Sequence, residues 1–101
     1  MVEVRSWFGN EPPSEAELRR IYAGEGLAPY TWSNAPGDIY SPHSHSYHKV
    51  IYVVRGSITF GLPQEERAVT LQAGDRLDLP PEVVHDATVG PDGVICLEAH
   101  K

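Results

Sequence analysis

The chain has 101 residues, a formal net charge of −6 and a single cysteine, Cys96. This length suffices for one domain with one hydrophobic core, and a lone cysteine excludes an intrachain disulfide and a cysteine-based zinc ribbon. The acidic balance argues against a nucleic-acid or anionic-membrane surface, which needs clustered lysines and arginines. No stretch approaches the roughly 20 apolar residues of a membrane span, and the first residues lack the apolar core of a signal peptide. We therefore expect a cytoplasmic protein without nucleic-acid or membrane partners.

A short helix is predicted at about residues 14–23. Ser14 and Glu17 have the spacing of a capping box, in which each side chain satisfies a free backbone N–H at the start of a helix. Leu18 and Tyr22 then share one face. About ten residues are too few for a stable isolated helix, so this one must dock on the rest of the chain.

The remaining sequence reads as short segments rich in β-branched and aromatic residues, separated by turn residues. The expected strands cover residues 2–8, 27–33, 49–54, 57–62, 68–73, 76–80, 83–89 and 94–99. Glycines and prolines separate them, including Arg55-Gly56 and the GPDG stretch at 90–93. Many short strands favour a β-sandwich or barrel. We expect one all-β domain over residues 1–101, in which a helix-bearing arm at 1–35 precedes a barrel core at 36–100.

Three histidines stand close together in the stretch PHSHSYHK, residues 42–49. Metal coordination by imidazole needs several nitrogens that converge on one point. Residues two apart in a strand face the same side, so His43 and His45 should project together. A third ligand must come from elsewhere, and His85 is the best candidate because its strand could lie opposite in a barrel.

The spacing of these residues resembles that of the cupins, small β-barrels of the double-stranded β-helix or jelly-roll type that usually bind a divalent metal inside. In the first motif, Gly37 is followed by five residues, His43-Ser44-His45, three further residues to Lys49, and Gly56. In the second motif, Gly74 is followed by five residues, Pro80-Pro81-Glu82, two valines and His85. The resemblance implies a cupin barrel with a short N-terminal helix and a metal held by His43, His45 and His85.

Three positions depart from the motifs. Glu82 and Val89 replace a glycine and an asparagine at structural positions, where such exchanges should be tolerable. Lys49 stands where the family has a metal-binding glutamate, so the centre is expected to be a modified one.

The orientation of Lys49 and that of His48 are coupled. If the strand has no bulge, Lys49 points into the barrel and His48 points away from it. An inward Lys49, if neutral, could be a base or a ligand; if charged, it could hold a carboxylate of the substrate. Lys49 is thus a tentative catalytic residue. If a bulge intervenes, Lys49 turns outward and His48 becomes a candidate fourth ligand.

Three neutral nitrogen ligands leave a coordination position open, which is typical of catalytic sites. Imidazole ligands suit Zn, Fe, Mn, Ni or Cu, and the sequence does not choose among them. We expect a metal-dependent enzyme, dioxygenase-like or isomerase-like, that acts on a small and potentially anionic substrate. The alternative is a non-catalytic module that binds or senses a metal or small molecule. The family habit of pairing barrels also suggests a homodimer.

Several further side chains have expected places. Candidate apolar lining residues of the barrel are Ile51, Val53, Phe60, Leu77 and Leu79. Packing is favoured over substrate contact for Trp32, Tyr40 and Tyr47. Cys96 is expected to be a buried small hydrophobe, and His100 a residue of the C-terminal tail. Val50, Tyr52 and Val54 should be covered by a partner or by the N-terminal arm.

Overall fold

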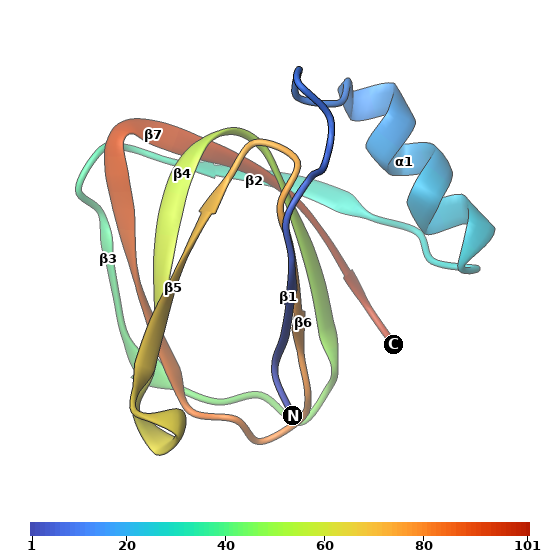
Figure 1. The fold of residues 1–101 in the computed structure, drawn as a ribbon. Coiled ribbons are helices and arrows are strands. Elements are labelled where there is room, and N and C mark those ends of the chain that lie inside the picture. Colours follow the sequence, from blue (N-terminus) through green and yellow to red (C-terminus); the bar gives the residue numbers. More distant parts are fainter.

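Two long antiparallel strands, β4 (Lys49–Leu62) and β7 (His85–His100), form the centre of the fold in the computed structural model, which describes residues 1–101. About half of the chain is β-strand, and the strands curve into a barrel with one helix outside it (Figure 1). The other elements are β1 (Glu3–Arg5), α1 (Glu15–Gly24), β2 (Tyr30–Asn34), β3 (Ile39–His43), a 3₁₀ turn (Pro63–Glu65), β5 (Arg67–Gln72) and β6 (Arg76–Leu79). The fold class predicted from the sequence, an all-β cupin barrel with a short N-terminal helix, is confirmed.

The other strands pair with different halves of this central pair. β4 pairs with β6 through its first residues and with β5 through its second half. β7 pairs with β3 near its start and with β2 near its end. β1 pairs with β6. β1 and β2 are therefore part of the seven-stranded sheet although both precede residue 36, where the barrel core was expected to begin.

β4 and β7 each replace two shorter strands that the sequence predicted, and this part of the prediction is wrong. The supposed turns at Arg55-Gly56 and at residues 90–93 are irregularities within continuous strands, where the β4–β7 register shifts. Gly56 has a φ of +81°, and a Cβ there would overlap the carbonyl of Gly93 on the neighbouring strand. Glycine thus lets the two strands bend together at a bulge without ending.

β3 (Ile39–His43) was not among the strands predicted from the apolar pattern. The prediction that His43 and His45 lie on one strand is wrong, because the strand ends at His43 and His45 lies in the loop that follows. The hydrogen bonds of β3 to β7 decide its conformation. The register places His43 opposite His85, so this short strand brings the two sequence motifs together.

Successive side chains of a strand point to opposite faces of the sheet, so the apolar side chains form two clusters, one inside the barrel and one outside it. The inner cluster fills the barrel and includes Val53, Leu77, Leu79 and Cys96. Cys96 is fully buried, and burial raises the pKa of its thiol to about 12, in line with its expected role as a small hydrophobe.

The outer cluster joins α1 to the barrel. The capping box of Ser14 and Glu17 is present, as predicted. Leu18 and Tyr22 are fully buried against the outer side chains of β4 and β7, Val50 among them. The Tyr22 hydroxyl also lies within hydrogen-bond distance of two backbone carbonyls of these strands. The N-terminal arm therefore covers the outer face of β4, one of the two expected alternatives. α1 is the only α-helix, and it is too short to cross a membrane.

Candidate metal centre

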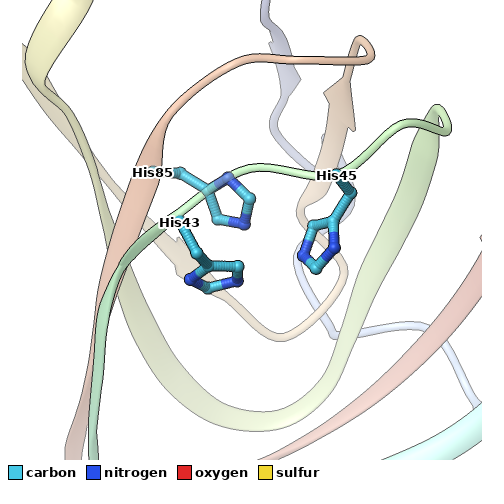
Figure 2. Close-up of side chains that lie close together, drawn as sticks. All are labelled: His43, His45 and His85. Atoms are coloured by element: carbon cyan, nitrogen blue, oxygen red, sulfur yellow. The ribbon is translucent and has the colours of Figure 1, made fainter.

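His43, His45 and His85 converge at one end of the barrel (Figure 2). His43 closes β3, His45 lies in the loop that follows, and His85 opens β7. One ring nitrogen from each residue lies within 4.8 Å of the others. The three nitrogens are close enough for one ion to bind all of them after small side-chain movements, since zinc–imidazole bonds are about 2.0–2.1 Å long.

Each of these rings is held by its Nδ1 atom. His43 Nδ1 is 2.7 Å from the Ser41 carbonyl oxygen, and His85 Nδ1 is 3.0 Å from the Val83 carbonyl oxygen. A carbonyl can only accept, so in the neutral form of either ring Nδ1 carries the proton and Nε2 keeps a free lone pair. This arrangement fixes the tautomer in which metal-binding histidines commonly coordinate through Nε2.

His45 is held by a side chain. Its Nδ1 lies 3.2 Å from the Tyr47 hydroxyl, and the two rings stack. Its Nε2 is buried and has no hydrogen-bond partner, the only side-chain polar atom of the protein in that condition. A buried nitrogen without a partner is costly unless a ligand satisfies it, so the donor set fits a divalent transition metal.

Burial lowers the pKa of His45, and the charge of Lys49 lowers it further. Burial also lowers the pKa of His85, against the effect of its bond to the Val83 carbonyl. Both rings are therefore neutral at pH 7, which is the form that binds a metal.

Lys49 faces the inside of the barrel, and His48 does not. The β4 bulges lie further along the strand, beyond Val53. The Lys49 ammonium lines the interior pocket. His48 approaches Asp78 on the outer face, with His48 Nε2 3.5 Å from Asp78 Oδ1. The geometry that would make His48 a fourth ligand is thus absent.

Glu98 is an interior residue that was not among the site residues predicted from the sequence. It is 3% exposed and lies across the strand pair from Ile51, on the face that Lys49 shares. Oε2 is 2.6 Å from the Tyr30 hydroxyl and 2.6 Å from His100 Nε2. Burial favours the neutral acid, but these hydrogen bonds and the charge of Lys49 hold the pKa of Glu98 below its usual range.

Two more contacts complete the surroundings of Glu98. Oε1 accepts from Trp32 Nε1 at 3.0 Å and lies 3.7 Å from Lys49 Nζ. His100, expected to belong to a loose tail, is the last residue of β7, and its ring centroid lies 4.0 Å from that of Tyr47. The sequence signal for Glu98 was its position two residues after Cys96, which puts both side chains on the same face of a strand. Its partners lie on β2 and β4, far away in the sequence, and no local pattern reveals them.

A pocket of about 250 Å³ has two of the three histidines, His43 and His85, in its lining, together with Lys49 and Glu98. Its other walls are aromatic and aliphatic. The lining residues are Tyr30, Trp32, Tyr40, His43, Tyr47, Lys49, Ile51, Ile58, Phe60, His85, Ala87 and Glu98.

One expectation about this lining needs correction. Val53, Leu77 and Leu79 are buried in the inner cluster and are not among the residues that line the pocket. Trp32, Tyr40 and Tyr47, expected to serve as packing, belong to the pocket wall, and Trp32 also packs against the inner cluster as expected.

Residues 29–98 match the family described as the AraC-like ligand binding domain. This match covers most of the chain, which therefore belongs to that family, a relative of the cupins. No curated protein sequence matches the chain significantly.

Solved structures agree on the fold. An RmlC-like cupin from Shewanella frigidimarina is 28% identical, with a TM-score of 0.63 over 73% of this chain and 64% of that one. The polyketide cyclase RemF from Streptomyces resistomycificus is 24% identical, with a TM-score of 0.63 over 73% of this chain and 54% of the cyclase. A DUF861 family protein from Thermotoga maritima is 12% identical, with a TM-score of 0.65 over the full length of both chains. The chain thus spans less than two thirds of the first two of these proteins.

Proposed function

We propose that this protein binds a divalent transition metal through His43, His45 and His85 and acts as a metal-dependent enzyme on a small molecule held in the barrel. The observation that carries the proposal is the convergence of three imidazoles whose Nδ1 atoms are already occupied, at the wall of a pocket large enough for a ligand. Three ligands of this kind would leave at least one coordination position for water or a small molecule.

A metal in this site would supply Lewis-acid activation or a centre for oxygen chemistry, which are the expected dioxygenase-like and isomerase-like reactions. The protein's own residues would do the rest. The three neutral histidines would leave the full double charge of the ion available to an anionic group. The aromatic walls would exclude water, and Lys49 would face the reacting molecule from the same pocket lining as His43 and His85.

The first test is elemental analysis of untagged protein beside a His85→Ala variant. We expect about one equivalent of Zn, Fe, Mn, Ni or Cu in the wild type and its loss in the variant. The metal found then directs oxygen-uptake assays with simple phenols, diketones and thiols. Failure to retain metal even after reloading would contradict the proposal.

The second candidate is a non-catalytic module that binds or senses a metal or small molecule. The match to a ligand-binding family over residues 29–98 favours it, as does the lysine at the place of the usual glutamate ligand. A ligand that binds the metal-loaded protein and is recovered chemically unchanged, with no oxygen uptake, would support this candidate over the enzyme.

A homodimer belongs to the proposal as well. Because α1 already covers Val50 and Tyr52, the contact would have to use other apolar surface, such as the exposed Ile39 of β3. Light scattering coupled to size-exclusion chromatography distinguishes the 11.2 kDa monomer from a dimer.

A further inference from the structure

We propose that Lys49 is the anion receptor of the interior pocket and that the pocket takes a small single-ring molecule bearing a carboxylate. This inference rests on the proposed function in one respect, that the pocket holds a small molecule. It adds the chemical class of that molecule and the residue that selects it.

The Lys49 ammonium is held in place but makes no hydrogen bond within the protein. Its nearest acceptor is Glu98 Oε1 at 3.7 Å, which is beyond direct hydrogen-bond distance. The side chain is only 14% exposed and lines the pocket, so any group that replaces the missing partner must lie in the pocket. The ammonium therefore offers donors to whatever enters the pocket, and a carboxylate is the strongest partner for them.

Glu98 does not need Lys49 as a hydrogen-bond donor. Tyr30 and Trp32 donate to its two oxygens, and His100 contacts it as well. A ligand carboxylate can thus approach Lys49 without leaving Glu98 unsatisfied. Glu98 holds the ammonium electrostatically while leaving its N–H groups free, which makes Glu98 a positioning residue.

The walls and the size of the pocket define the rest of the ligand. Trp32, Tyr40 and Phe60 present ring faces and edges, which suit a flat apolar body. The volume of about 250 Å³ exceeds the roughly 150 Å³ of a cavity that binds benzene and falls below the roughly 300 Å³ at which sites for drug-sized ligands begin. One ring with one or two small substituents fits between these limits.

His43 and His85 line the same pocket as Lys49. A ring acid with an additional hydroxyl or keto group would present its carboxylate to Lys49 and its second oxygen to the candidate metal centre. The pocket therefore favours acids of this kind.

The test compares benzoate, benzamide and benzylamine as probes of nearly equal shape and different charge. Isothermal titration calorimetry on the untagged full chain, both metal-stripped and metal-loaded, measures their affinities. Wild-type protein should bind benzoate at least about tenfold tighter than benzamide, the difference expected for one charge-assisted hydrogen bond, and should bind benzylamine least.

The chain has only two lysines, so it provides its own control. Lys49→Met should abolish the preference for benzoate, Lys49→Arg should keep most of it, and Lys101→Met should leave it unchanged. Circular dichroism confirms folding of each variant. If Lys49→Met does not fold, the ratio of the wild-type affinities for benzoate and benzamide still tests the inference.

Equal affinity of the wild type for benzoate and benzamide would overturn the inference, as would a preference for benzylamine, which would assign the recognition to Glu98. The metal-stripped sample separates this inference from the proposed function. Lysine-dependent benzoate binding in a protein that never retains metal would support the receptor and refute the metal centre. Metal retention without any benzoate preference would support the metal centre and refute the receptor.

Discussion

At the scale of single residues, each proposed ligand depends on one neighbour for its orientation. His43 and His85 use backbone carbonyls two positions earlier, which a side-chain substitution cannot remove. His45 depends on the Tyr47 hydroxyl. His45 is therefore the ligand whose support can be tested by mutation.

Tyr47→Phe removes this hydroxyl and keeps the ring that stacks on His45. Because outer partners of ligating histidines typically contribute about 10–100-fold to metal affinity, we expect a loss in that range. Competition with a chelator of known affinity measures it. The matched control is Tyr40→Phe, since Tyr40 lines the same pocket but donates its hydroxyl to Asn34. Equal losses in the two variants would show that Tyr47 does not support His45.

At the scale of elements, the bend in the central strand pair depends on Gly56. Its positive φ and its closeness to the Gly93 carbonyl both exclude a side chain. We expect Gly56→Ala to lower the free energy of unfolding by about 3 kcal/mol or more, since backbone strain and steric overlap add.

Gly26→Ala is the control for this substitution. Gly26 has a similar positive φ, but a Cβ there would meet no atom within 4 Å. Gly26→Ala should therefore lower the free energy of unfolding only by the backbone strain of a left-handed conformation, about 1–2 kcal/mol. Chemical denaturation measures both variants, and equal costs would argue that the strands are not in tight contact at Gly56.

The docking of α1 is the second feature at this scale. Leu18 is fully buried between the helix and the outer face of the β4–β7 pair. Leu18→Ala should reduce the free energy of unfolding by about 2–5 kcal/mol through lost burial and the cavity left behind. Arg20→Ala, at an exposed position of the same helix, should change it by no more than about 0.5 kcal/mol. A small effect of Leu18→Ala in urea denaturation would mean that α1 contributes little to stability.

At the scale of the whole molecule, Arg76 links the helix to the barrel. Its buried guanidinium donates to Asp78 on its own strand and to Glu25 at the end of α1. Burial would raise the pKa of Asp78, but the hydrogen bonds from Arg76 lower it overall. The same guanidinium lowers the pKa of Glu25.

These lowered pKa values predict acid sensitivity. In the unfolded chain the carboxyl groups of Asp78 and Glu25 have ordinary pKa values of about 4, so they take up protons at a higher pH than in the folded protein. The stabilisation from Asp78 and Glu25 is therefore complete above about pH 5 and is lost as the pH falls through the lowered pKa values of the folded state. Urea denaturation between pH 7 and pH 3 measures the loss. Glu25→Gln should show a shallower pH dependence, and an unchanged slope would remove Glu25 from this account.

The class of fold, the capped helix and the three candidate ligands could be predicted from the sequence. Local signals are sufficient for these features. The capping box of Ser14 and Glu17 acts within one turn, and the spacing between His43 and His45 is a property of a few adjacent residues. His85 could be paired with them through the second motif, whose spacing matches the family's. The metal itself stays a prediction.

The residues that meet across the barrel could not be predicted from the sequence. Gly56 reads as a turn in the sequence, yet the partner strand makes it a bulge inside β4. Lys49 and Glu98 are 49 positions apart and come together because β4 and β7 pair with their inner faces aligned. Strand register depends on hydrogen bonds between distant segments, which local pattern does not encode. The pocket and its charged end are therefore properties of the fold as a whole.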